Sequence, residues 1–153
     1  MTKIFVFSFL ILTILKISYC SDVVVLTPEN FDQIVDGSRP VLIDFYAPWC
    51  GFCKKLDPEW DDLAKRVKEG GDKVIIAKID ASEHSSFASR YPVSGFPTLI
   101  YFPNGPKSNQ PYEGDRDLDS FIEFLNENAD TRVFIFHSSH IYKKNLMIYF
   151  LNS

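Results

Sequence analysis

The stretch that decides the fold is Trp49-Cys50-Gly51-Phe52-Cys53, where two cysteines lie three residues apart. It follows an apolar run at residues 41–46, which predicts a buried strand, and it opens a stretch with helical periodicity. A helix that begins here places Cys50 at its N-terminus, where unpaired backbone N–H groups and the helix dipole favour a negative charge. The pKa of such a thiol falls, and its thiolate is a nucleophile near neutral pH. Because Cys53 lies nearly one turn further on the same helix face, the pattern predicts a redox-active dithiol.

Composition narrows the class of protein. The length of 153 residues suits one domain, and an apolar content of 46% supports a hydrophobic core. The net charge of −4, with no basic stripe, argues against nucleic acid as a partner.

The first twenty residues have the pattern of a secretory signal peptide. A basic start, Met1-Thr2-Lys3, precedes an apolar run over residues 4–15. That run is shorter than the roughly 18 residues needed to span a membrane. Ser18 and Cys20 are small enough for the −3 and −1 positions of a cleavage site.

Cleavage after Cys20 would leave only two thiols, Cys50 and Cys53. In the oxidising secretory pathway this favours a catalytic pair over a structural bridge. We therefore expect a signal peptide at residues 1–20, one domain at 21–129 and a C-terminal tail at 130–153.

The periodicity of the domain predicts alternating strands and helices, followed by a hairpin and a last helix capped by Asp117. The expected strands are 23–26, 41–46, 73–79, 98–102 and 110–113, and the expected helices are 28–35, 50–67, 82–91 and 118–125. This order of elements predicts an α/β sandwich with a mixed sheet.

Three segments together resemble the thioredoxin domain of the protein disulfide isomerase family. Residues 45–56 are similar to its active-site segment, Gly95-Phe96-Pro97-Thr98 to its cis-proline loop, and Tyr112-Glu113-Gly114-Asp115-Arg116 to its late Tyr-x-Gly-x-Arg segment. The resemblance covers about residues 23–128. It implies a thioredoxin fold, in which a central mixed β-sheet is flanked by helices on both faces and the active site lies at the carboxyl end of a strand.

The resemblance implies a role for each thiol. Cys50 is the attacking thiol and Cys53 the buried resolving thiol, so a mixed disulfide forms through Cys50 and is released by Cys53. The redox group is then the Cys50–Cys53 disulfide itself, without a separate cofactor or metal, and glutathione or a partner oxidoreductase exchanges electrons with it.

The resemblance also implies a substrate-binding surface around the dithiol. Pro97 is the cis proline that faces it, and the backbone of Phe96 offers hydrogen bonds to an extended substrate. Trp49, Gly51 and Phe52 complete this surface. The expected substrates are unfolded or misoxidised polypeptides, bound as extended strands.

Three charged residues have implied roles in proton transfer. Asp44 matches the buried acid of thioredoxins, where the disulfide isomerases usually carry Glu; burial raises its pKa, so that it can take a proton from Cys53. Lys78 matches the lysine near that acid, and Arg116 matches the arginine that stabilises the Cys53 thiolate. A structural buried ion pair or a solvated strand end stays open for Asp44 and Lys78, and an exposed charge before the last helix stays open for Arg116.

Phe52 departs from the family pattern, which usually has His at this position. A histidine cation stabilises the Cys50 thiolate, whereas Phe cannot, so the couple becomes more reducing. We expect a reduction potential below that of a Phe52→His variant, between about −180 mV and about −270 mV.

These residues predict a thiol–disulfide oxidoreductase or protein disulfide isomerase that acts on secretory-pathway proteins. A redox-inactive chaperone or peptide-binding module with the same fold is the alternative, since apolar side chains of Trp49, Phe52 and Phe96 could hold unfolded chains.

A zinc site is a further alternative. Cys50, Cys53, His137 and His140 are ligand types for zinc, but the histidine spacing is tighter than in usual zinc fingers.

The tail leaves localisation open between the endoplasmic reticulum lumen and secretion. Its apolar stretches, 133–136 and 146–151, are interrupted by histidines and lysines, so a spanning helix is not expected, while contact with a membrane surface stays open. The last residues, 150–153, are not a retention signal of the Lys-Asp-Glu-Leu type. The sequence makes no prediction of oligomeric state.

Overall fold

The computed structural model describes residues 21–129. The predictions made for residues 1–20 and 130–153, including the signal peptide, its cleavage site and the two tail histidines, lie outside the described residues.

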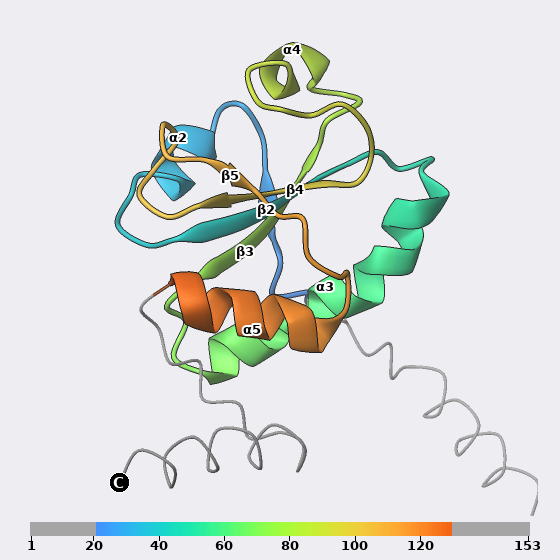
Figure 1. The fold of residues 1–153 in the computed structure, drawn as a ribbon. Helices are drawn as coiled ribbons and strands as arrows, with labels where there is room; N and C mark the ends of the chain where they lie inside the picture. The colour runs from blue at the N-terminus through green and yellow to red at the C-terminus, as the bar shows by residue number, and fades with distance from the viewer. Residues whose placement is uncertain (1–20, 130–153) are drawn as a thin grey trace, which may run out of the picture.

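A mixed five-stranded sheet, in the order β1-β3-β2-β4-β5, forms the centre of the domain (Figure 1). Strands β1, β3 and β2 are parallel, β4 is antiparallel to β2, and β5 is antiparallel to β4. The strands are β1 (Val24–Leu26), β2 (Val41–Tyr46), β3 (Ile75–Asp80), β4 (Thr98–Phe102) and β5 (Gln110–Pro111). The central strand β2 is buried along almost its whole length, which explains its continuous apolar run.

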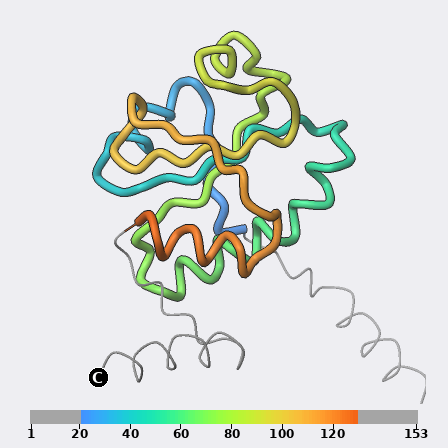
Figure 2. The backbone as a smooth tube through the Cα atoms, in the orientation of Figure 1, coloured from blue at the N-terminus to red at the C-terminus, as the bar shows by residue number. Residues whose placement is uncertain are grey.

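Helices cover both faces of this sheet (Figures 1 and 2). On one face lie α3 (Gly51–Glu69) and α5 (Leu118–Asn128), and on the other lie α2 (Phe31–Ile34) and α4 (Ser85–Ala88). The predicted class, an α/β domain with a mixed sheet between two helical layers, is confirmed.

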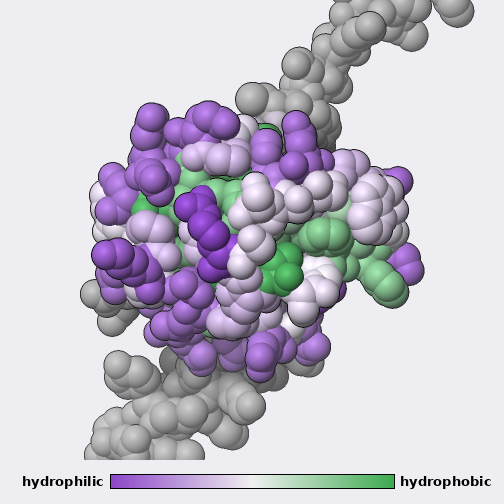
Figure 3. Space-filling view, turned by 90° about the horizontal axis from the view of Figure 1, so that it is seen from above, coloured by the Kyte–Doolittle hydropathy of each residue, from purple (hydrophilic) through white to green (hydrophobic). Residues whose placement is uncertain are grey.

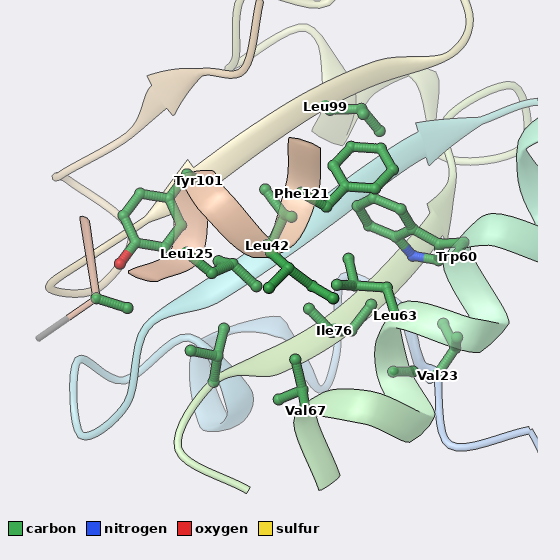
Figure 4. Close-up of a cluster of buried hydrophobic side chains, with 14 of the residues drawn as sticks. Val23, Leu42, Trp60, Leu63, Val67, Ile76, Leu99, Tyr101, Phe121 and Leu125 are labelled. Atoms are coloured by element: carbon green, nitrogen blue, oxygen red, sulfur yellow. The ribbon is translucent and has the colours of Figure 1, made fainter. Parts of the chain in front are cut away.

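The core between α3, α5 and the sheet is built around Trp60 (Figure 4). Its side chain is 1% exposed, and its ring packs edge-on against Phe121 with centroids 5.4 Å apart. Its indole Nε1 donates a hydrogen bond to the Ala77 carbonyl at 3.1 Å. The hydroxyl of Tyr101 likewise donates to the Asn128 carbonyl at 3.2 Å. Polar atoms in this core are therefore paired with backbone carbonyls.

Helix α2 begins later than predicted. Thr27 was expected to cap a helix starting at Pro28, but the helix starts at Phe31. The side chain of Asn30 accepts the Thr27 N–H at 2.8 Å, and the Thr27 carbonyl accepts the N–H groups of Asn30 and Phe31. These bonds close a turn in place of the first helical turn.

Helix α4 is shorter than the predicted 82–91. The carboxylate of Asp80 accepts hydrogen bonds from the backbone N–H groups of Ser82 and Glu83, at 2.9 and 3.0 Å, and this fixes a turn before the helix. Such side-chain bonds compete with helical ones.

Among the other elements, β2 and β4 have the predicted bounds, and the predicted cap of α5 is confirmed because the Asp117 carboxylate accepts the Ser120 N–H at 3.0 Å. The strand predicted at 73–79 lies at Ile75–Asp80, and the one predicted at 110–113 is confined to Gln110–Pro111. Within the described residues, the structure contains no helix that could cross a membrane, by length and apolar character.

Candidate active site

The two cysteines lie where β2 gives way to α3. Cys50 is the N-cap residue of the helix, and its Sγ accepts the backbone N–H of Cys53 at 3.2 Å. On its other side, the Cys50 thiol donates to the Phe96 carbonyl at 3.5 Å. The predicted location of Cys50 at a helix N-terminus is confirmed.

The surroundings of Cys50 favour its thiolate. Burial opposes ionisation, but hydrogen bonds from the Cys53 thiol and from the backbone N–H groups of Cys53 and Phe52 outweigh it, so the pKa of the Cys50 thiol is lowered. The negative charge of Asp44 acts in the opposite direction.

Cys53 lies deeper and behaves in the opposite way. Its side chain is 2% exposed, and burial, together with its hydrogen bond to Cys50, raises the pKa of the Cys53 thiol to about 12. The negative charge of Asp44 adds to this effect. The pair therefore combines a thiol that ionises readily with one that keeps its proton.

The cis-proline loop faces this pair. The peptide bond between Phe96 and Pro97 is cis, as predicted. The ring of Phe96 packs against the cluster formed by Ala47 and the two cysteines. Trp49 contacts Phe96 edge-on, with ring centroids 5.7 Å apart.

Exposed aromatic side chains border the dithiol. Trp49 is 70% exposed and Phe52 is 69% exposed, although both are large and apolar. Figure 3 shows the molecule from above, and on this face apolar side chains form a green patch among hydrophilic ones. The ammonium group of Lys55 lies 5.7 Å from the centre of the Phe52 ring. A Cβ added at Gly51 would have no atom within 4 Å, so packing does not require glycine there.

Asp44 is the buried acid beneath the cysteines. It is 2% exposed, and its Oδ1 has no hydrogen-bond partner. Burial raises the pKa of its carboxyl group to about 7, and the negative charge of Asp57 adds to this effect. The positive charges of Lys78 and Arg116 oppose it. The predicted direction of the shift in the pKa of Asp44 is confirmed.

Lys78 lies beside Asp44 in the sheet but pairs with another residue. The register of β2 and β3 aligns Asp44 with Lys78. The Lys78 Nζ lies 3.8 Å from Asp57 Oδ1 and 5.6 Å from the centre of the Tyr46 ring. Sequence analysis did not identify Asp57; the available signal was its position one turn after Cys53 on the same face of the helix.

Arg116 reaches the cis-proline loop from a tight turn. The Tyr112 hydroxyl donates to the Asp115 carbonyl at 2.6 Å, and the Tyr112 side chain lies over Gly114, where an added Cβ would meet its oxygen at 2.5 Å. This turn directs the Arg116 guanidinium to the Pro97 carbonyl, to which Nη2 donates at 3.2 Å. Arg116 thus contacts the loop opposite the cysteines.

The zinc alternative depends on residues that the structure does not describe. Within residues 21–129, no three His, Cys, Asp or Glu side chains gather in an arrangement that could hold a metal ion. The two other proposed ligands, His137 and His140, lie outside that range.

Comparisons with known proteins agree with this geometry. The sequence model of the thioredoxin family matches residues 22–127. The chain is 51% identical over 112 residues to protein disulfide isomerase-like 2-1 of Oryza sativa, an alignment that covers 72% of this chain and 30% of that protein. It is 43% identical over 122 residues to protein disulfide-isomerase 1 of Dictyostelium discoideum, covering 76% and 33% of the two chains. The chain thus spans about a third of the length of these relatives.

Among solved structures, the first thioredoxin domain of mouse protein disulfide-isomerase A4 superimposes with a TM-score of 0.62 at 34% identity. The match covers 77% of this chain and 80% of that domain's chain. With the family match over residues 22–127 and the mixed sheet between two helical layers, it shows that the chain has a thioredoxin fold and belongs to the thioredoxin family.

Proposed function

We propose that this chain is a thiol–disulfide oxidoreductase that acts as a protein disulfide isomerase. The observation that carries the proposal is the contrast between the two thiols, since the pKa of Cys50 is lowered and that of Cys53 is raised. The names of its relatives, which are protein disulfide isomerases, support the same activity.

The reaction begins at the more acidic thiol. The Cys50 thiolate attacks one sulfur of a substrate disulfide, the substrate S–S bond breaks, and a mixed disulfide forms while one substrate thiolate leaves. The backbone N–H groups at the start of α3 stabilise the Cys50 thiolate before the attack.

The second step needs a base for Cys53. The Asp44 carboxylate takes the proton of Cys53, whose thiolate then attacks the Cys50 sulfur. The Cys50–substrate bond breaks, the second substrate thiolate leaves, and the Cys50–Cys53 disulfide forms, so the substrate gains the two electrons that the dithiol loses. Glutathione or a partner oxidoreductase returns the electrons. When a second substrate thiolate attacks the mixed disulfide first, the outcome is isomerisation.

The remaining charged residues support these steps. Lys78 and Arg116 lower the energy of the Asp44 carboxylate, as their effects on its pKa indicate. Arg116 also braces the cis-proline loop through the Pro97 carbonyl.

The substrate binds as an extended strand beside Phe96. Trp49, Gly51, Phe52 and Pro97 complete the binding surface, and the exposure of the two aromatic side chains supports contact with unfolded polypeptides. Main-chain pairing makes this recognition largely independent of substrate sequence.

The working compartment in this proposal is the secretory pathway, either the endoplasmic reticulum lumen or the outside of the cell. The signal-peptide pattern of residues 1–20 supports it. The corresponding domain division is 1–20, 21–129 and 130–153.

The exposed aromatic residues favour one second candidate, a peptide-binding module without redox turnover. It predicts that unfolded chains still bind when both cysteines are serine.

Refolding of scrambled ribonuclease beside reduction of insulin tests the proposal and separates the candidates. Cys50→Ser should lower turnover by roughly a thousandfold or more, because the nucleophile is lost. Cys53→Ser should accumulate the mixed disulfide, visible by mass spectrometry of the acid-quenched reaction. A wild type that binds unfolded chains but turns over neither substrate contradicts the proposal.

A further inference from the structure

We propose that Asp57 is a positioning residue for proton transfer at the dithiol: it holds the ammonium group of Lys78 and so leaves the carboxyl group of Asp44 without a cationic partner. This inference rests on the proposed function, in which Asp44 accepts the proton of Cys53.

The sheet brings the three side chains to one place. Leu42 and Ile76 belong to the core between the sheet and α3, and Asp44 and Lys78 follow them by two residues in neighbouring strands. Since side chains alternate along a strand, Asp44 and Lys78 lie on the same face. That face is covered by α3, which carries Asp57.

Two contacts hold the Lys78 ammonium group near the rim of this site. Asp57 Oδ1 lies 3.8 Å from Nζ, and the Tyr46 ring centre lies 5.6 Å from it. In contrast, Asp44 Oδ1 has no hydrogen-bond partner, and no ion pair joins Lys78 to Asp44 within residues 21–129. The nearest cation in the sheet is thus engaged by Asp57.

Other charged groups also face Asp44. Both thiols approach from the start of α3, and their pKa values respond to Asp44. Arg116 approaches from the turn before α5, but its Nη2 donates to the Pro97 carbonyl. Lys78 and Arg116 favour the Asp44 carboxylate, whereas Asp57 disfavours it.

The negative charge of Asp57 therefore acts on Asp44 in two ways, and both disfavour the ionised form of the Asp44 carboxyl group. It repels the Asp44 carboxylate directly, and it holds the lysine that would otherwise neutralise that carboxylate. Both make the Asp44 carboxylate a stronger base, which suits a group that must accept a proton from a buried thiol.

Titration of Asp44 in the reduced protein, by NMR of its side-chain carboxyl carbon, tests the inference directly. Asp57→Asn keeps the shape of the half-exposed side chain and removes its charge. We expect it to move the midpoint of the Asp44 titration down by about one pH unit, the lower end of the effect of a charge at this range. The resolution of a preformed mixed disulfide by Cys53, followed against pH in a single turnover, should show its low-pH limb shifted in the same direction.

Three further variants sharpen the test. Asp62→Asn removes the same charge from an exposed position of the same helix and should leave the Asp44 midpoint unchanged. Asp57→Glu should restore the wild-type midpoint. In a Lys78→Met background, Asp57→Asn should shift the midpoint by less than half as much, because the lysine is no longer available to be released.

The inference is overturned if the midpoint of the Asp44 titration is the same in Asp57→Asn and Asp62→Asn. It is also overturned if Asp57→Asn shifts that midpoint equally in the wild-type and the Lys78→Met backgrounds. The failure of the proposed function has another signature, a wild type without insulin or ribonuclease turnover. Because the carboxyl titration needs no turnover, the two failures are distinguishable.

Discussion

Buried polar groups are treated differently in two regions of this molecule. In the core beneath α5, the Trp60 indole and the Tyr101 hydroxyl each donate to a backbone carbonyl. At the base of the dithiol, Asp44 is equally buried, but one of its carboxyl oxygens has no partner.

This difference distinguishes a region that stabilises the fold from a region that carries out the proposed reaction. A buried polar group without a partner costs free energy, so a core built only for stability pairs each one. The Asp44 carboxyl group acts electrostatically on Cys53, the thiol that must lose a proton. Its burial, with the negative charge of Asp57, raises its pKa to about 7. The two regions should therefore respond to substitution with opposite signs.

The largest effect is expected in the core. Trp60→Ala should lower the free energy of unfolding by about 3–5 kcal/mol, because it opens a cavity beside Phe121 and removes the hydrogen bond to Ala77. The loss should be the same at pH 5 and pH 8, since no titratable group is removed, and urea unfolding measures it. Val25→Ala, at a position 58% exposed, is the control and should change stability by less than about 0.5 kcal/mol. A strongly pH-dependent loss in Trp60→Ala would contradict this expectation.

At the site, Asp44→Asn should stabilise the protein. The pKa of Asp44 is raised from 3.8 to about 7, so the folded state keeps a proton that the unfolded chain has already lost. The penalty grows as the pH rises through this interval and is complete above about pH 7; at about 1.4 kcal/mol per unit it reaches as much as about 4 kcal/mol.

Urea unfolding at several pH values measures this difference. The stabilisation by Asp44→Asn should be full at pH 8 and should vanish below about pH 3, where Asp44 is neutral in both states. A variant that is destabilised at pH 8 would show that the carboxylate has partners that offset its burial.

Gly114→Ala changes the turn between Tyr112, which packs against the core, and Arg116, which contacts the cis-proline loop. The added methyl group would lie 2.5 Å from the Tyr112 hydroxyl oxygen, and the Tyr112 ring is held against Phe121 and Phe124. We expect a loss of about 1–3 kcal/mol in urea unfolding, since the clash forces the turn to move. Gly95→Ala is the matched control, because an added Cβ there meets nothing within 4 Å. If Gly114→Ala and Gly95→Ala are equally stable, the close approach of Tyr112 to Gly114 does not constrain the turn.

The smallest effect concerns the exposed rim. Phe52→His should raise the reduction potential, because a histidine cation stabilises the Cys50 thiolate and hence the reduced state. A gain of about 1.4 kcal/mol corresponds to about 30 mV, measured by equilibration with glutathione. Phe52→Leu, which adds no charge, should stay near the wild-type value. If the wild-type reduction potential equals or exceeds that of Phe52→His, the proposed effect of Phe52 on the thiolate is wrong.

Sequence patterns predicted the elements that depend on apolar runs. Strands β2 and β4 have their predicted bounds, because a strand buried on both sides needs an uninterrupted apolar run. The predicted start of α2 was wrong, because the Asn30 Oδ1 accepts the Thr27 backbone N–H and closes a turn where the helix was expected to begin. Similarly, the Asp80 turn shortened α4.

At the site, local spacing was sufficient for the cysteines and the family resemblance for the cis proline. Asp57 could not be assigned in this way. Its ion pair with Lys78 joins α3 to β3, and it exists only because the sheet register brings Lys78 beneath the helix. Electrostatic partners that come from distant segments need the folded chain.

The positions of the two tryptophans give this protein a pair of optical reporters. Trp49 is 70% exposed and lies next to Cys50 in the sequence, whereas Trp60 is 1% exposed. Aqueous iodide should therefore quench the emission of Trp49 and spare that of Trp60. Fluorescence from one indole then follows events at the dithiol, while the other follows unfolding, in the same cuvette and without a label.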